Sequence, residues 1–237
     1  MSNNKIAVIP TYNEEENINA LLDAIFKIDK DLHVLFIDDS SQDKTALLIQ
    51  NSMYGFGSKI FLLTRPKKLG LGTAYITGFS WALEHGYEII IGMDADLSHD
   101  PLYIPSLIEG LHTNDGVIGS RYVFGGKIKN WGLLRHALSR LASTYARITL
   151  GVSIKDLTAG FSAWRASALK KLDLPAIQSE GYIFQIELKY RALKKGLRLQ
   201  EIPIVFTERR AGISKISGKI IFEAIWRTPW LRNKNFS

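Results

Sequence analysis

Short apolar runs alternate with longer segments of helical periodicity through the first half of the chain. Four of the apolar runs predict β-strands, at residues 5–9, 33–37, 59–63 and 87–93. The segments between them predict helices, at residues 14–28, 43–51 and 72–85. Strands and helices that alternate in this way favour a mostly parallel sheet with helices on both faces. The predicted fold class is therefore α/β.

The second half of the chain loses this regular alternation. Its expected elements are a strand at 115–119, a helix at 133–150, a strand and a short helix within 162–172, a helix at 181–195, strands at 197–201 and 204–207, and a helix from about 217. The glycine-containing stretch 124–130 predicts a turn. No stretch approaches the roughly 20 apolar residues that span a bilayer. We therefore expect one domain over residues 1–237, without a transmembrane segment.

Two of the expected helices combine apolar and basic residues. In the helix at 133–150, apolar residues recur at helical spacing with Arg135, Arg140 and Arg147 between them. The final helix carries Trp226 and Trp230 beside arginines. Helices of this kind can lie on an anionic membrane surface. For the helix at 133–150, packing of the apolar stripe on the sheet is the commoner arrangement, and for the final helix docking on the core is an equal alternative. The pattern alone leaves both interpretations open.

Composition and charge narrow the class of partner. A content of 46% hydrophobic and 22% charged residues is ordinary for a soluble globular protein. The absence of cysteine excludes disulfides and thiolate metal sites and is compatible with a reducing cytosol, and the amino terminus lacks a signal-peptide pattern. The formal charge of +7 favours an anionic partner such as a nucleotide, a phospholipid surface or nucleic acid. The lack of zinc, RNP-like and arginine-rich patterns argues against nucleic acid.

Two carboxylates, Asp94 and Asp96, follow directly after the buried apolar run at 89–91. Ligands of α/β sheets bind beyond the carboxyl ends of the strands, and carboxylate oxygens are the donors that Mg²⁺ and Mn²⁺ prefer. The alternative is an Asp-rich turn that caps a helix beginning near Pro101, which is the commoner explanation for an isolated Asp-x-Asp. Polar segments also follow other predicted strands, and this favours a metal site at Asp94 and Asp96.

Four further segments carry residues that could bind parts of a nucleotide ligand. After the first strand comes Tyr12, on which a flat ligand could stack, and after the second comes Asp39, a candidate for hydrogen bonding to a ribose or base edge. Gly70 and Gly72 precede a helix and could cradle phosphate, although their spacing matches neither the P-loop nor the dinucleotide fingerprint. The basic segment 209–215 predicts a loop that closes over an anion. Together these features predict a site for a metal–diphosphate leaving group beside a nucleoside.

Several of these segments resemble motifs of family 2 glycosyltransferases with the GT-A fold. The motifs that carry this resemblance are 9–14, 38–43, 70–74 and 94–99. Others are similar to dolichol-phosphate mannose synthases, and most of all to the soluble polyprenol-monophosphate mannosyltransferases of actinobacterial type: 119–122, 158–161, 181–185 and 209–215. The resemblance extends from about Lys5 to Arg227.

The resemblance implies inverting transfer of mannose from GDP-mannose to a polyprenyl monophosphate of the dolichyl type. The residues implied for donor binding are Pro10, Tyr12, Glu14, Ile37, Asp39, Asp94, Ala95, Asp96, Ser98, Arg209 and Lys215. Asp96, together with Asp94, would ligate Mg²⁺ or Mn²⁺, and Ser98 stands where many relatives have glutamine. The residues implied for the acceptor phosphate are Arg121, Arg135 and Ser139.

A phosphate acceptor simplifies the expected mechanism. A phosphate monoester has a second pKa of about 6, so it is largely dianionic at neutral pH and needs no strong general base. We therefore expect the catalytic residues Asp94, Asp96 and Arg121 to place charge and not to abstract a proton. We also expect peripheral attachment to the cytoplasmic face of a membrane through the segments at about 120–150 and 216–237, with or without a membrane-protein partner.

Three alternatives stand beside this function, the first of them within the same family of transferases. The nearest is a UDP-glucose-dependent transferase with the same lipid acceptor, because the sequence does not distinguish guanine from uracil by chemistry. The second is a non-catalytic nucleotide-binding scaffold, which the joint presence of Asp94, Asp96, Arg121, Arg209 and Lys215 disfavours. The third is a basic nucleic-acid binder, which the missing recognition motifs disfavour.

Overall fold

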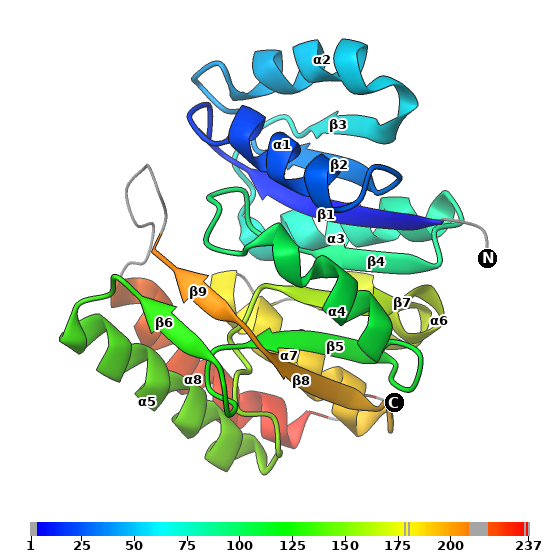
Figure 1. The fold of residues 1–237 in the computed structure, drawn as a ribbon. Helices are drawn as coiled ribbons and strands as arrows, with labels where there is room; N and C mark the ends of the chain where they lie inside the picture. Colours follow the sequence, from blue (N-terminus) through cyan, green and yellow to red (C-terminus); the bar gives the residue numbers. More distant parts are fainter. Residues whose placement is uncertain (1–3, 178, 180, 209–217, 235, 237) are drawn as a thin grey trace.

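A seven-stranded sheet with helices on both faces forms the body of the molecule (Figure 1). The computed structural model describes residues 4–177, 179, 181–208, 218–234 and 236. The strand order is β3-β2-β1-β4-β7-β5-β8, and β7 alone runs antiparallel to its neighbours. The strands of this sheet are β1 (Lys5–Thr11), β2 (His33–Asp38), β3 (Ile60–Thr64), β4 (Ile89–Gly92), β5 (Gly116–Ser120), β7 (Ser162–Arg165) and β8 (Leu199–Pro203). The predicted mostly parallel α/β fold is confirmed.

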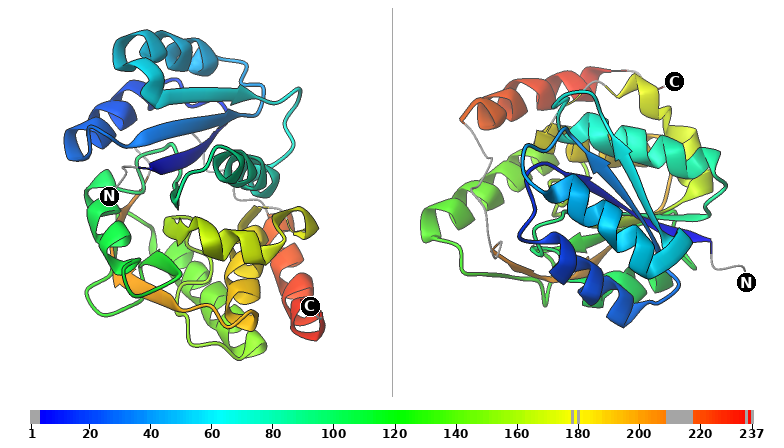
Figure 2. Two further views of the ribbon diagram at one scale, coloured as in Figure 1. Left: turned by 90° about the vertical axis from the view of Figure 1, so that its right-hand side faces the viewer. Right: turned by 90° about the horizontal axis from the view of Figure 1, so that it is seen from above.

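The helices cover the sheet and extend past one of its ends. They are α1 (Ile18–Ile28), α2 (Thr45–Phe56), α3 (Leu71–Glu84), α4 (Ile104–Gly110), α5 (Leu133–Leu150), α6 (Ala166–Leu169), α7 (Gly181–Lys194) and α8 (Gly218–Asn233). One-turn 3₁₀ helices lie at 57–59, 101–103, 170–172 and 174–176. Views from the side and from above show α5 beside α8 at one edge of the molecule (Figure 2).

Two local predictions are wrong. The stretch 124–130 is not only a turn, because β6 (Lys127–Lys129) pairs in parallel with β9 (Val205–Thr207) as a second, two-stranded sheet. A three-residue strand is too short to show a period of two, and its pairing depends on a partner that is distant in sequence. The helix expected at 14–28 begins only at Ile18, because residues 14–17 form a turn.

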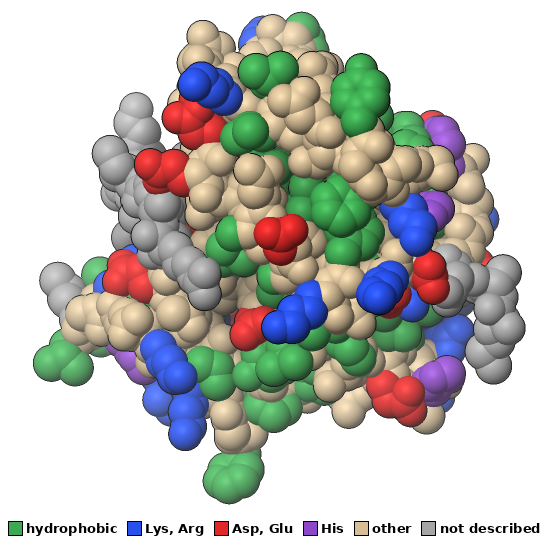
Figure 3. Space-filling view, turned by 45° about the horizontal axis from the view of Figure 1, so that its top comes forward, with side chains coloured by type: hydrophobic (Ala, Val, Ile, Leu, Met, Phe, Trp, Pro, Cys, Tyr) green, Lys and Arg blue, Asp and Glu red, His purple; other side chains and the backbone are tan. Residues whose placement is uncertain are grey.

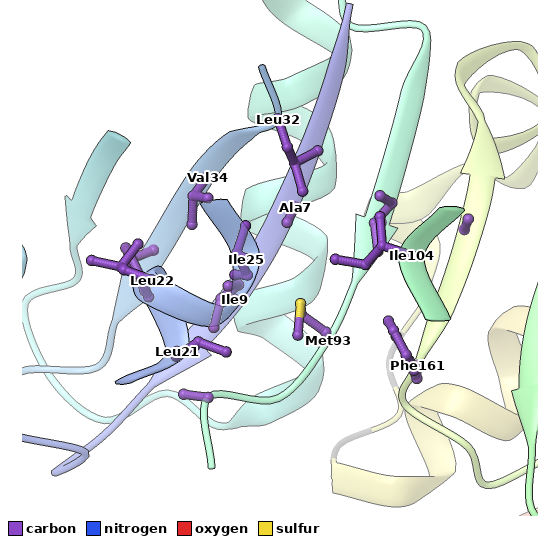
Figure 4. Close-up of a cluster of buried hydrophobic side chains, with 14 of the residues drawn as sticks. Ala7, Ile9, Leu21, Leu22, Ile25, Leu32, Val34, Met93, Ile104 and Phe161 are labelled. Atoms are coloured by element: carbon purple, nitrogen blue, oxygen red, sulfur yellow. The ribbon is translucent and has the colours of Figure 1, made fainter. Parts of the chain in front are cut away.

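The central strands are buried on both faces, which explains their continuous apolar runs. On one face, Ala7 and Ile9 of β1 pack with Leu21 of α1 (Figure 4). The same cluster holds Met93 and Phe161, which flank the carboxyl end of β4 and the start of β7. The hydrophobic core thus anchors the loop that leaves the carboxyl end of β4 and the loop that enters β7.

On the other face, α3 lies against β1 at very short range. A Cβ at Gly78 would overlap Cγ1 of Val8, so a side chain at this position would push the helix away from the strand. This close approach places Tyr75, one turn earlier on α3, in the core beside Phe79 and Phe184. It also brings the tyrosine to the carboxyl end of β4.

The apolar stripe of α5 does not pack on the sheet. The buried residues of this helix include Ser143, Ala146 and Leu150. The exposed apolar residues follow helical spacing on another face: Leu138, Leu141, Tyr145 and Ile148. The commoner of the two arrangements considered for this helix is therefore wrong. Among the helices in the described part of the chain, none is long and apolar enough to cross a bilayer.

Candidate active site

The loops that carry the predicted site residues leave the sheet at one edge. The strands β1, β2, β4 and β5 are mutually aligned in the same direction, so their carboxyl ends meet there. Because β7 is antiparallel, its amino end lies at this edge as well, with Ser162 opposite Gly92. The edge therefore gathers Asp39, Asp94, Arg121 and the backbone of Gly160.

Asp94 is held from three directions. The Tyr75 hydroxyl donates a hydrogen bond to Asp94 Oδ1 at 2.9 Å, and the Asp94 backbone N–H donates to Nδ1 of His99 at 2.9 Å. A Cβ on Gly160 would lie 3.5 Å from Asp94 Oδ1 and 3.2 Å from Cε1 of His99, so the glycine backbone lies close to the carboxylate. The side chain keeps 35% of its surface exposed. It is fixed in orientation and open to a ligand.

His99 supports this arrangement as a neutral ring. Burial lowers the pKa of His99 against the opposing effect of Asp94. Since Nδ1 accepts the Asp94 amide hydrogen, the proton is assigned to Nε2, and the 3.8 Å separation of Nδ1 from Asp94 Oδ2 is no ion pair. The ring stacks on Phe161 with centroids 5.1 Å apart and meets the edge of Phe206 at 5.6 Å.

Asp96 sits deeper than Asp94. Its exposed fraction is 8%, and its Oδ1 accepts the backbone N–H of Ser98 at 3.1 Å. Leu97, between Asp96 and Ser98, has a φ of +59°, a backbone conformation that costs energy for a residue with a bulky side chain. Ala95 and Ser98 are buried. Neither Asp94 nor Asp96 caps the helical turn at 101–103. Its cap is Asp100, whose side chain accepts the backbone N–H of Leu102 at 2.9 Å.

The carboxylates of Asp94 and Asp96 suit a hard divalent cation. They offer oxygen donors only, which is the preference of Mg²⁺ and Mn²⁺. Within the described ranges, no group of three or more His, Cys, Asp or Glu residues is placed to hold a metal ion. A metal at this pair would take its remaining ligands from water and from phosphate oxygens, as Mg²⁺ does at diphosphate sites. The residues fit a metal that arrives with a nucleoside diphosphate.

Asp39 is committed to an internal network. It forms a buried ion pair with Arg65, and its Oδ2 accepts the backbone N–H groups of Leu69 and Gly70 at 3.2 and 3.1 Å. Arg65 in turn donates to the carbonyl of Gly70 and to the hydroxyl of Thr73. The amide of Gly70 binds a carboxylate of the protein, so the expected phosphate cradle is not the arrangement in this structure.

The other residues implied for the nucleoside lie on the loops after β1 and β2. The ring of Tyr12 carries the Lys68 Nζ 3.9 Å from its centroid, in the place where a flat ligand was expected. Glu14 accepts a hydrogen bond from the side chain of Asn17 at 2.8 Å. Pro10 pairs with Ile37 in the sheet register, and the Ile37 side chain is fully buried. Ile37 as a whole has no exposed surface, so this structure offers a ligand no access to it.

Arg121 forms the centre of a second group of residues. Its Nε and Nη2 donate to the two carboxylate oxygens of Asp156, both at 2.7 Å, and Nη2 also donates to the Thr158 hydroxyl at 2.8 Å. Burial opposes ionisation of the fully buried Asp156, but the Arg121 guanidinium outweighs it and lowers the pKa of the carboxyl. A two-pronged ion pair of this kind fixes the plane of the guanidinium.

The structure brings the other two predicted acceptor residues close to Arg121. Ser139 accepts a hydrogen bond from the Tyr122 hydroxyl at 2.8 Å, and Arg135 donates to Glu208 at 2.6 Å. The Trp131 ring has the Arg135 guanidinium 4.2 Å from its centroid and that of Arg121 at 5.9 Å. The two arginines thus flank one tryptophan.

A cavity of about 450 Å³ opens beside this group. Its lining combines cationic, aromatic and apolar side chains, and includes Arg121, Tyr122, Phe124, Lys127, Lys129, Ile128, His136 and Arg140. The Phe124 side chain is fully exposed at its rim. Lys and Arg side chains gather beside hydrophobic ones on this side of the surface, at the lower left of Figure 3.

The sequence analysis missed Phe206, which lies between the group around Asp94 and His99 and the group around Arg121. Its ring touches His99 and also lies 5.3 Å from the Arg121 guanidinium and 5.4 Å from the Trp131 ring. Nothing in the short strand β9 marks this residue. Asp156 and Tyr75 were also missed, although an acid two residues before the motif at 158–161 and a tyrosine on the apolar face of a strand-exit helix were available signals. Arg209 and Lys215 lie outside the described residues.

Known proteins resemble this chain over most of its length. A polyprenol monophosphomannose synthase from Mycolicibacterium smegmatis is 43% identical over 94% of this chain and 84% of its own length. An undecaprenyl-phosphate mannosyltransferase from Micrococcus luteus is 44% identical over 93% of this chain and 90% of its own length.

The fold has solved counterparts. Glucosyl-3-phosphoglycerate synthase from Mycobacterium tuberculosis with phosphoglyceric acid superposes with a TM-score of 0.72 at 19% identity, covering 99% of this chain and 82% of that one. The same enzyme with Mn²⁺ and UDP-glucose gives a TM-score of 0.71 at 19% identity, over 99% and 81%. The profile described as Glycosyl transferase family 2 matches residues 6–173. The chain belongs to glycosyl transferase family 2.

Proposed function

We propose that this glycosyltransferase moves mannose from GDP-mannose to a polyprenyl monophosphate, with inversion at the anomeric carbon. The observation that carries the proposal is the basic cavity beside Arg121, which adjoins a helix with an exposed apolar stripe. A polyprenyl phosphate matches both features. Its anionic phosphate suits the basic cavity, and its long isoprenoid chain suits the exposed apolar stripe. The names of the two curated relatives support a mannosyl donor and a polyprenyl phosphate acceptor.

In the donor half, Asp94 and Asp96 would hold Mg²⁺ or Mn²⁺ together with the diphosphate of GDP-mannose. The bound metal would neutralise charge on the leaving diphosphate. Tyr75 and His99 fix Asp94 before the donor arrives, so little reorganisation is needed at this carboxylate. We assign Pro10, Tyr12, Glu14, Ile37 and Asp39, with Ala95, Ser98, Arg209 and Lys215, to donor binding. A neighbour with this fold was solved with Mn²⁺ and UDP-glucose, which supports a metal-bound nucleotide sugar as the donor.

Donor binding at the assigned nucleoside positions would require two local changes. The Lys68 ammonium would leave the Tyr12 ring, and the Asp39–Arg65 pair would yield or share a carboxylate oxygen. A guanine base has a flat face for the tyrosine and hydrogen-bond donors for the carboxylate. Both changes are small movements of side chains on loops, which is the usual scale of change at a preformed site.

In the acceptor half, Arg121, Arg135 and Ser139 would bind the acceptor phosphate. The approach of a phosphate dianion to a diphosphate donor is opposed by charge repulsion, and fixed guanidinium groups offset that repulsion. Asp156 holds Arg121 rigidly, so the arginine need not be ordered again during the reaction. The dianionic acceptor needs no strong general base. A single displacement by this oxygen, opposite to the departing diphosphate, inverts the anomeric centre.

Attachment to the membrane completes the proposal. The exposed apolar stripe of α5 and the exposed Trp226 and Trp230 of α8 belong to two adjacent helices. Basic residues accompany them, including Arg140 and Arg147, and such residues are attracted to the anionic lipids of the cytoplasmic leaflet. We therefore propose peripheral binding to the cytoplasmic face, with α5 placing the mouth of the basic cavity at the headgroup level.

A direct assay tests this function. Purified protein is incubated with radiolabelled GDP-mannose or UDP-glucose, with polyprenyl phosphate or dephosphorylated polyprenol, and with Mg²⁺, Mn²⁺ or a chelator. We expect label in the organic-extractable lipid only with GDP-mannose, the phosphorylated lipid and a metal. Label from UDP-glucose alone would replace the donor in the proposal. Label in free polyprenol, or in no lipid under any condition, would overturn it.

A further inference from the structure

Lys189 is a fully buried lysine that the proposed function does not use. It lies on α7, and its Nζ donates hydrogen bonds to the backbone carbonyls of Leu157 and Ala159 at 3.1 and 2.7 Å. The carbonyl and the side-chain oxygen of Gln185 lie 3.2 and 3.1 Å from the same nitrogen. An ammonium has three N–H donors, so these oxygens satisfy all of them inside the protein.

The two carbonyls bound by Lys189 belong to the loop that holds Arg121. Within the loop 156–159, the side chains of Asp156 and Thr158 accept hydrogen bonds from Arg121. Lys189 therefore ties the backbone of the same four residues whose side chains fix the guanidinium. On the far side, the carboxylate of Glu201 accepts the backbone N–H groups of Lys155 and Asp156 at 2.8 and 2.9 Å. The loop is held between α7 and β8.

The charges around Lys189 compensate one another. Asp156 and Glu201 face it as anions, and Arg121 faces it as a cation. Burial lowers the pKa of Lys189 to about 7, against the attraction of Asp156. The side chain therefore changes charge near neutral pH. A neutral amine keeps two N–H donors and loses the third, so the four oxygens around Nζ then share two hydrogens and the hold on the loop is weakened.

We propose that Lys189 is a positioning residue of the acceptor half: its ammonium fixes the loop 156–159 and thereby holds the Arg121 guanidinium at the wall of the basic cavity. This inference rests on the proposed function, which assigns that cavity to the acceptor phosphate. Lys189 does not touch the cavity itself, because it is not among the residues that line it. Its influence reaches the acceptor only through the loop and Arg121.

Kinetics separate this role from general structural support. Lys189→Met removes the ammonium with little change in volume, and Lys194→Met removes the same charge from the exposed end of α7. With farnesyl phosphate as a water-soluble acceptor, we expect Lys189→Met to raise the KM for the acceptor about tenfold, the size of a lost hydrogen bond to a charged group. The KM for GDP-mannose should stay at the wild-type value, and Lys194→Met should change neither constant. Equal increases in both constants, or no increase, would overturn the proposal.

The pH profile gives a second readout. In the wild type, the KM for the acceptor should rise as the pH increases through about 7, because the ammonium loses its proton. In Lys189→Met this rise should be absent. Protonation of the acceptor phosphate below a pH of about 6 affects both proteins equally, so the ratio of their KM values isolates the lysine. Parallel profiles for the two proteins would contradict the assignment.

A measurement on Arg121 decides the inference without any transfer reaction. The Nε–H of Arg121 donates to Asp156 at 2.7 Å, so its NMR cross-peak reports the geometry of the pair. We expect this cross-peak to shift with a midpoint near pH 7 in the wild type and not in Lys189→Met, while Gln185→Leu retains the titration. A peak that is indifferent to pH and to the lysine would refute the inference even if sugar transfer occurs. If no sugar is transferred, the proposed function fails, and the NMR titration still decides whether Lys189 controls Arg121.

Discussion

The Tyr75 hydroxyl on α3 donates a hydrogen bond to Oδ1 of Asp94, 2.9 Å away at the end of β4. Tyr75 itself is fully buried and stacks on Phe184 with ring centroids 5.8 Å apart. A rigid aromatic side chain thus sets the orientation of a carboxylate that is 35% exposed. Such supporting hydrogen bonds commonly tune the affinity of the metal ligand that they hold.

Removing this hydroxyl should weaken metal use without damaging the fold. In Tyr75→Phe, the ring packing is kept and the donor to Asp94 is lost. We expect the metal concentration for half-maximal transfer to rise about tenfold, because the carboxylate is free to rotate away. A titration of activity with Mn²⁺ measures this directly. The matched control is Tyr54→Phe, at a tyrosine that is 90% exposed on α2; an identical Mn²⁺ dependence for all three proteins would contradict the assigned role.

The Arg121–Asp156 pair should matter for both stability and acceptor use. Asp156→Asn removes the anion from a fully buried site and leaves Arg121 only 9% exposed. Breaking a buried pair in this way costs about 3–5 kcal/mol, which urea denaturation can measure. Thr158→Val removes only the hydroxyl that accepts the 2.8 Å hydrogen bond from Arg121 and should remain well folded. It should still raise the KM for the acceptor, and an unchanged acceptor KM in this variant would count against Arg121 as a phosphate ligand.

Lys189 makes the folding stability depend on pH. Its pKa is about 7 in the folded protein and 10.5 for an ordinary lysine. Between these values the unfolded chain binds more protons than the folded one, so stability rises with pH by up to about 1.4 kcal/mol per unit. Below pH 7 both states are protonated and this contribution to the slope vanishes. Urea midpoints at pH 7, 8 and 9 should therefore increase more in the wild type than in Lys189→Met; equal slopes would mean that the buried lysine keeps its proton.

Membrane binding should depend on the exposed apolar residues of α5. Leu141 and Ile148 are 64% and 68% exposed, so replacing both with aspartate should not disturb the core. We expect the double variant to lose most of its co-sedimentation with vesicles that contain anionic lipid, because two charges would enter the apolar region. Leu47→Asp, at a residue 53% exposed on α2, should bind like the wild type. Retained binding by the α5 variant would locate the attachment elsewhere.

The sequence was most informative where residues are buried on both faces of the sheet. The apolar runs of β1, β2 and β4, alternating with helical segments, predicted a mostly parallel sheet, and the rule that ligands bind at strand ends then pointed to Asp94 and Asp96. Both follow from local pattern together with a general property of α/β folds. The roles of these acids are still a prediction.

Contacts between distant segments account for what was missed. Nothing near Asp39 in the sequence indicates that its carboxylate forms an ion pair with Arg65. Likewise, nothing near Phe206 indicates that its ring lies beside both His99 and Arg121. The periodicity of α5 revealed an apolar stripe, but periodicity does not say whether another element covers the stripe. The tertiary arrangement decided that Leu141 and Ile148 stay exposed.

The central claim is that the Asp94–Asp96 pair acts on a metal–diphosphate during mannosyl transfer. The most direct test compares Asp96→Ala with Asp100→Ala in the transfer of radiolabelled mannose from GDP-mannose to polyprenyl phosphate. Asp100 is exposed and caps the next helical turn, so its variant controls for loss of a nearby acid. We predict that Asp96→Ala forms no metal-dependent lipid product, whereas Asp100→Ala does. Full transfer by Asp96→Ala in the presence of a chelator would contradict the account.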